Sequence, residues 1–132
     1  MAALVQVHAN NILDASMGTA AFAATVTPMK CRLMTVIGSA TAAGTELATS
    51  AGYVAGTGLS PATMAAAAAG SAASSVALTQ TNMPAATIVA VELWDSTATP
   101  VRKWYGALTA NKTTNLGDTF TIPSGSLTAA LS

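Results

Sequence analysis

The chain has 132 residues, of which five are Lys or Arg, five are Asp or Glu, and one, Cys31, is a cysteine. This length fits a single domain covering residues 1–132, and a chain of this size buries enough apolar surface to hold a core without a metal or a disulfide. Only 8% of the residues are charged and the net charge is zero, which argues against the basic surface that nucleic acid or an anionic membrane would require.

Residues 2–17 show the pattern of a short amphipathic helix. Val5, Ile12, Leu13 and Met17 can share one stripe, and Gly18 suits the end of a helix. The lone His8 lies on or beside that stripe. We expect it to be a packed or surface histidine, because no second histidine is present to complete a metal site.

The next stretch predicts one strand and a loop. Residues 29–37 are β-prone, and alternation places Met29, Cys31, Leu33, Thr35 and Ile37 on one face with Lys30 and Arg32 on the other. Residues 38–50 have the composition of a loop, and residues 53–59 could form a short strand broken by glycines.

Residues 60–75 form a low-complexity segment rich in alanine. Alanine favours a helix, and Pro61 after Ser60 suits a first helical turn. Such a helix would present nothing larger than methyl groups, so an extended arm or loop on another subunit is the alternative, and both remain open. Residues 47–91 carry no charge. Small and polar residues interrupt this stretch, so it does not predict a membrane span.

Residues 87–132 predict a C-terminal β-meander. Residues 87–94 form a strong strand with Val89, Val91 and Leu93 on one face, and residues 101–108 form the returning strand after a turn at 95–100. Turns at 116–118 and 123–125 separate two further strands, at 119–122 and 127–131. We therefore expect a mainly β fold, a single-domain antiparallel β-sandwich or meander with one short N-terminal helix.

The sequence offers no pattern of catalytic, metal-binding or nucleotide-binding residues. Glu92 and Asp95 are the nearest pair of acids, and Arg102 or Lys103 across the hairpin would neutralise them on a solvated face. Trp94 and Trp104 could stack on a sugar ring, but packing is the more common role for such rings. We therefore expect no enzyme activity, no cofactor, no metal and no small-molecule substrate.

The C-terminal residues resemble those of a known family. Trp104, Tyr105, Gly106 and Leu108 form an aromatic-Gly-Ala-Leu-Thr strand end, followed by Lys112, by a turn of Gly117, Asp118 and Thr119, and by Gly125 and Leu127. This order is similar to the signature of small tailed-phage virion proteins, commonly labelled tail-fibre-like or minor structural proteins. The resemblance implies a structural role in a virion, and the alanine content of residues 64–75 departs from the family pattern.

Within that setting three roles remain open. The first is a capsid decoration protein, bound to the outside of the major capsid protein shell together with copies of itself, as a trimer on a symmetry axis. The second is a tail-fibre or baseplate component, and the third is a carbohydrate-binding module. A surface of small apolar residues suits burial against other protein chains. We expect those contacts from residues of the uncharged stretch, namely Met64, Ala65, Ala66, Ala67, Ala68, Ala69, Val76 and Leu78.

Overall fold

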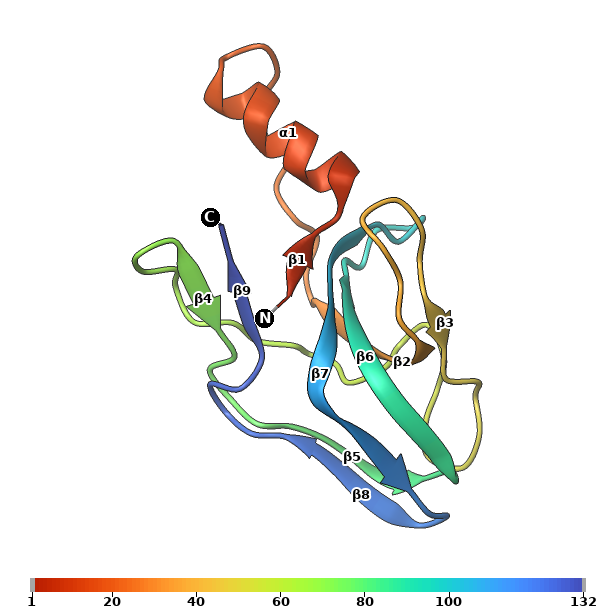
Figure 1. Cartoon of the computed structure of the whole chain (residues 1–132). Coiled ribbons are helices and arrows are strands. Elements are labelled where there is room, and N and C mark those ends of the chain that lie inside the picture. The colour runs from red at the N-terminus through yellow and green to blue at the C-terminus, as the bar shows by residue number, and fades with distance from the viewer. Residues whose placement is uncertain (1, 132) are drawn as a thin grey trace.

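The computed structural model describes residues 2–131, which form nine strands and one helix (Figure 1). In chain order the elements are β1 (Ala3–Leu4), α1 (Gln6–Ser16), β2 (Lys30–Val36), β3 (Thr45–Glu46), β4 (Ser71–Ala73), β5 (Leu78–Met83), β6 (Ala86–Trp94), β7 (Arg102–Thr114), β8 (Asp118–Ile122) and β9 (Thr128–Ala130). The expected class is confirmed: the fold is mainly β, with antiparallel sheets and a short helix near the N-terminus.

The largest sheet has five strands in the order β1-β7-β6-β2-β3, and all its neighbours are antiparallel. Cys31 lies opposite Leu93 and Leu33 opposite Val91, so these four side chains share one face. The predicted face of Val89 is wrong, because a bulge changes the alternation there. The two steps from Ile88 to Ala90 on β6 correspond to five steps from Lys112 to Ala107 on β7, and Ile88, rather than Val89, is fully buried.

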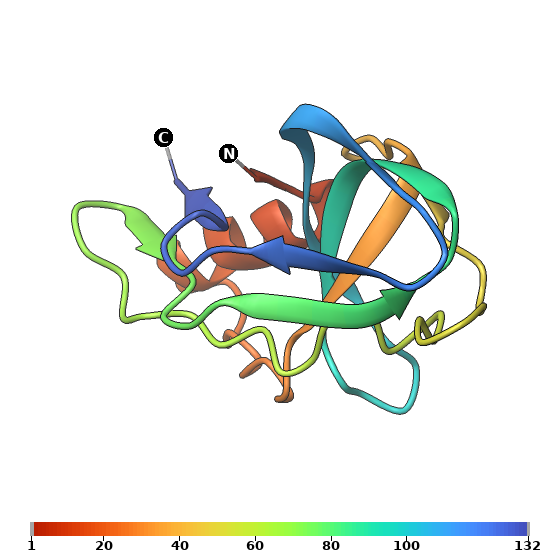
Figure 2. The ribbon, with the colours of Figure 1, turned by 90° about the horizontal axis from the view of Figure 1, so that it is seen from below.

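Two further two-stranded ribbons complete the fold. β5 pairs with β8, and this ribbon crosses one face of the large sheet, as Figure 2 shows from below. β4 pairs with β9, and a parallel bridge from Ala2 to Ala129 ties β9 to the start of the chain. In this two-layer arrangement, apolar side chains from both layers interdigitate between them to form the core.

The core lies between the large sheet and the β5–β8 ribbon. Its fully buried side chains from the sheet and the connecting loop include Leu33, Ile88 and Tyr53, and Met83 and Phe120 come from the ribbon. Cys31 is also completely buried. Fully burying side chains of this size stabilises the fold by about 1.5–3 kcal/mol each, before the cost of ordering them.

The predicted C-terminal meander is wrong beyond its first hairpin. β6 and β7 pair as expected, and β7 runs on to Thr114 because its last residues pair with the start of β6. The next two strands do not join them, since β8 pairs with β5 and β9 pairs with β4. Phe120 and Ile122 on β8 are both buried, and they reach the core only because β8 folds over the sheet instead of extending it.

The alanine-rich segment is extended, so the helical alternative for residues 60–75 is wrong. It forms a hairpin in which Met64 bridges Ser74 and Ala68 bridges Ser71, and the second limb contains β4. The amide of Ala65 donates to the carbonyl of Ala73 across this hairpin. These cross-hairpin bonds, together with the pairing of β4 to β9, satisfy backbone groups that a helix would otherwise pair internally.

The predicted helix at 2–17 begins later than expected. Residues 3 and 4 form β1 beside β7, and the amide of Val5 donates to the carbonyl of Lys103, so α1 starts at Gln6. Its end agrees with the prediction, because Gly18 has a positive φ of 73° just beyond Met17. No helix within residues 2–131 is long and apolar enough to cross a membrane.

Candidate interaction surface

The residues predicted as an interface lie mainly on the alanine hairpin, residues 64–75. Ala65 to Ala69 are all exposed, Val76 just beyond the hairpin is 48% exposed, and Met64 is half-buried against the core. Leu78 does not belong with them: it is 4% exposed and packs in the core, because alternation along β5 turns it inward. Seven of the eight predicted residues are therefore at least partly accessible to solvent, and the eighth, Leu78, belongs to the core.

Helix α1 contributes a second apolar surface beside this hairpin. Leu13 is 61% exposed and Met17 is 73% exposed, so these two members of the predicted stripe face solvent, whereas Val5 is buried and Ile12 is half-buried. His8 is the one buried residue of α1, and its ring packs 5.8 Å from Phe22 and 6.4 Å from Trp104. The helix is held to the domain by an aromatic contact at His8, and its apolar side chains Val7 and Leu13 face solvent.

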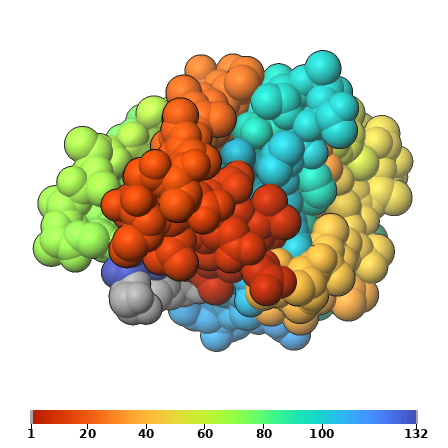
Figure 3. Space-filling view, turned by 90° about the horizontal axis from the view of Figure 1, so that it is seen from above, coloured from red at the N-terminus to blue at the C-terminus, as the bar shows by residue number. Residues whose placement is uncertain are grey.

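Seen from above, α1 and the segment after it cover the middle of one face of the molecule (Figure 3). The alanine hairpin lies on one side of them and the 95–100 loop on the other. Exposed large apolar side chains on this helix and segment are Val7, Leu13, Met17, Phe22 and Val26. These side chains leave apolar area on this face that the fold itself does not cover.

The charges of the chain are largely paired inside the fold. Glu92 is 1% exposed, and its carboxylate accepts from Arg102 Nη1 at 2.9 Å, from the Gly44 amide at 2.8 Å and from Trp94 Nε1 at 3.1 Å. The predicted partner is right but the solvated position is wrong. Three donors satisfy this carboxylate, which offsets the cost of removing it from water.

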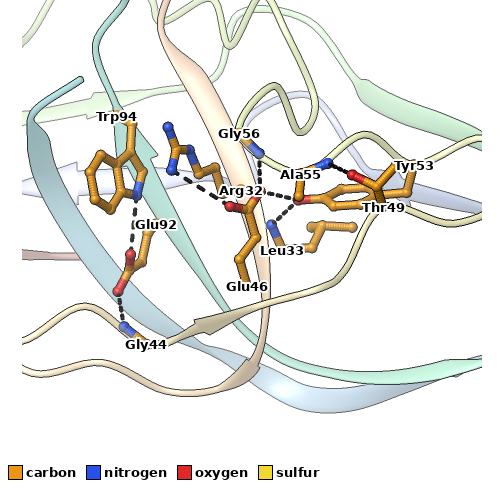
Figure 4. Close-up of polar contacts among 10 residues, drawn as sticks. All are labelled: Arg32, Leu33, Gly44, Glu46, Thr49, Tyr53, Ala55, Gly56, Glu92 and Trp94. Atoms are coloured by element: carbon orange, nitrogen blue, oxygen red, sulfur yellow. Dashed lines mark hydrogen bonds and ion pairs between the residues drawn. The ribbon is translucent and has the colours of Figure 1, made fainter. Parts of the chain in front are cut away.

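Glu46 organises a neighbouring polar cluster, which Figure 4 shows together with Glu92. Its carboxylate lies 3.5 Å from Arg32 Nη1 and accepts hydrogen bonds from the Tyr53 hydroxyl at 2.9 Å and the Gly56 amide at 2.8 Å. Arg32 in turn lies 4.1 Å over the ring of Trp94. The cluster joins β2, β3 and the loop after β3, so its role is to fix that loop on the sheet.

Asp95 anchors the turn between β6 and β7. Burial alone would raise the pKa of its carboxyl, but hydrogen bonds from the Val101 amide and from Thr97, with Lys103 at 3.4 Å, hold that pKa below its ordinary value. It is 2% exposed, so here too the expected solvated pair is instead a buried one. With three cation–anion pairs buried or half-buried, the exterior carries very little charge.

The two tryptophans do not form a shared sugar-binding platform. Leu93 pairs with Trp104, whereas Trp94 pairs with Lys30, and neighbouring positions on β6 point to opposite faces of the sheet. Trp104 packs against the core and His8, and the guanidinium of Arg32 covers Trp94. This geometry does not support the carbohydrate-binding alternative, and the contacts of Trp104 fit the packing role that the sequence favoured.

The signature residues of the C-terminal segment shape turns and packing. Gly117 and Gly125 have φ values of 90° and 80°, which glycine adopts without strain. Asp118 accepts a hydrogen bond from the Asn115 amide at 2.8 Å and closes the β7–β8 turn. Leu127 is buried. The remaining signature residues are Trp104 and Leu108, packed against the core, Gly106, buried in β7, Tyr105, half-buried, and Lys112 and Thr119, exposed.

Two shallow grooves lie on the surface. One, of about 350 Å³, runs between the segment before β2 and the alanine hairpin, with Met29, Met64 and Trp104 in its lining. The other, of about 310 Å³, lies between β7 and β8 and includes Gly106, Ala110 and Phe120. Neither contains a cluster of ionisable side chains, and no group of three His, Cys, Asp or Glu within residues 2–131 is placed to hold a metal.

Comparison with protein families gives a match over nearly the whole chain. The model of a protein family described as "Podophage GP4 fiber I protein gp80" matches residues 3–130, almost the whole chain. The curated proteins contain no match. The match covers the helix, the alanine hairpin and the C-terminal strands together, so it covers every element of the fold described above.

Proposed function

This chain belongs to the podophage GP4 fiber I protein gp80 family, and on that premise we propose that it is a subunit of a podophage fibre which acts by burying its apolar surface against neighbouring protein chains. The family match supports a structural role in a tailed-phage virion. The sequence expectation of a virion protein, based on the C-terminal signature, is confirmed at that level.

The observation that carries this proposal is the exposed apolar surface of α1 and the alanine hairpin. Leu13 and Met17 stand more than half exposed on a helix whose one buried residue is His8. A helix that turns its larger apolar side chains to water gains stability when another surface covers them, at about 25 cal/mol per Å² of apolar area removed from water. The shortage of exposed charge means that few ionic groups must be desolvated when this happens.

A capsid decoration protein is the second candidate, with the major capsid protein and further copies of this chain as its partners. The observation that favours it is the compact two-layer fold, since residues 2–131 contain no extended fibrous segment and no repeated unit. Either role is non-catalytic in this proposal, and neither requires a cofactor.

Copy number in purified particles separates the two candidates. Quantitative mass spectrometry measures this chain against the major capsid protein, and gold-labelled antibody locates it on the particle by electron microscopy. A few copies per particle with label at the tail supports the fibre subunit. A ratio near one, or a simple fraction of one, with label over the shell replaces it with the decoration role. Absence of the chain from particles overturns both.

A further inference from the structure

The groove between β7 and β8 is bounded by two strand edges that lack strand neighbours. β1 covers β7 only opposite Trp104 and Tyr105, so from Gly106 onward that edge of β7 pairs with no strand of residues 2–131. β8 pairs with β5 on one side, and its other edge likewise has no strand beside it in this part of the chain. Figure 2 shows β7 and β8 diverging after the turn that joins them.

Such a groove fits an extended peptide strand. Free backbone amides and carbonyls on a strand edge are satisfied by the backbone of an added strand, which forms a new row of the sheet. Gly106, Ala107 and Ala110 line the β7 side and leave room for a thin occupant, while Phe120 and Leu127 give the groove an apolar wall. An occupant that suits this lining is uncharged, extended and made of small residues.

The alanine hairpin provides a strand of that description. Ala65 and Ala68 donate their amides inward to Ala73 and Ser71. The amides of Ala66 and Ala67 have no partner within the described residues, so this limb also has a free edge. Natural edge strands are commonly protected by Lys, Pro or inward-pointing charges. Residues 65–69 carry none of these and project away from the large sheet and from the β5–β8 ribbon.

We propose that the limb of residues 65–69 in one copy inserts into the β7–β8 groove of a second copy. Charge favours this pairing, because the limb is uncharged and the groove has one ionic residue, Lys112, which is exposed. Insertion therefore leaves no buried charge without a partner. Donor and acceptor are different surfaces, so each copy can give one limb and accept another, and the contact propagates head to tail. It is a property of the purified chain and does not depend on the virion position proposed above.

Cross-linking between two variants, each with one introduced cysteine, tests the contact directly. Ala67→Cys and Ala110→Cys proteins are mixed and treated with a short flexible bis-maleimide, which tolerates a shift of one residue in register. Cys31 is fully buried and does not compete. A cross-linked dimer formed in the mixture but by neither variant alone is the expected result. Efficient dimers of Ala67→Cys alone would mean that two limbs pair with each other, and would overturn the insertion.

Sedimentation of the full chain over a range of concentrations supplies the second test. The unmodified chain should self-associate, and Ala67→Glu should weaken that association by about tenfold or more, because it places an unpaired carboxylate in the groove. Ala98→Glu in the exposed 95–100 loop is the matched control and should associate normally. Unfolding midpoints verify that both variants fold. A chain that stays monomeric throughout, or an Ala67→Glu variant that associates as well as Ala98→Glu, overturns the proposal.

Discussion

The buried pair of Glu92 and Arg102 allows a prediction of its energetic worth. Replacing Arg102 by Met keeps most of the side-chain length but leaves the Glu92 carboxylate, 1% exposed, with only the Gly44 amide and the Trp94 indole as donors. Removing one partner of a buried pair costs about 3–5 kcal/mol. With a urea dependence of about 2 kcal/mol per M for a domain of this size, the unfolding midpoint should fall by roughly 1.5–2.5 M.

Urea unfolding followed by tryptophan fluorescence measures this change, since Trp94 contacts Glu92 directly. The matched control is Arg32→Met, which removes a cation from a longer and more exposed pair at 3.5 Å and should cost about 1 kcal/mol. Adding Glu92→Gln to Arg102→Met should restore part of the lost stability, because the uncompensated charge is then gone. An Arg102→Met cost below that of Arg32→Met would refute the reasoning that burial makes this pair decisive.

Three further predictions follow from buried or strained positions. Burial, with a smaller effect from Lys103, lowers the pKa of His8. The folded state then binds fewer protons than the unfolded state, so urea midpoints should fall as pH drops from 7.5 to 5.5. A His8→Phe variant that keeps the full fall would contradict this. Burial raises the pKa of Cys31 to about 12, so maleimide should label it only after denaturation, and labelling in native buffer would show an open core. Gly58→Ala would bring its Cβ into the Cys31 carbonyl oxygen, whereas Gly56→Ala meets nothing within 4 Å. Both positions have positive φ, so Gly56→Ala should cost about 1–2 kcal/mol and Gly58→Ala clearly more in the same unfolding assay.

Local patterns predicted the strands better than their partners. The position of strand β6 and the Gly117 and Gly125 turns could be identified from sequence, because β-propensity and positive φ are properties of a few adjacent residues. The pairing of β8 with β5 could not be identified, since Phe120 lies opposite Gln80, forty residues earlier. Nothing local distinguishes a strand that extends a sheet from one that folds over its core.

The candidate surface was likewise only partly accessible to sequence reasoning. The uncharged alanine run is visible as composition, but helix propensity and tertiary pairing disagree there, and the cross-hairpin bonds from Ala65 and Ala68 decided the outcome. On α1, the weak pattern could not show that His8 rather than Leu13 faces inward. The burial of Glu92 depends on a donor from a distant loop, the Gly44 amide, which no short motif reveals.

The internal pairing of charge has a consequence for the particle in its surroundings. Dissolved salt screens charges that lie in water over a distance of about 8–10 Å at ordinary ionic strength, and it acts much less on pairs inside a protein. Since most ionic groups of this chain neutralise one another within the fold, the contacts proposed above would involve few exposed charges for salt to screen. A particle joined by such contacts would then keep them over a wide range of ionic strength in the medium around it.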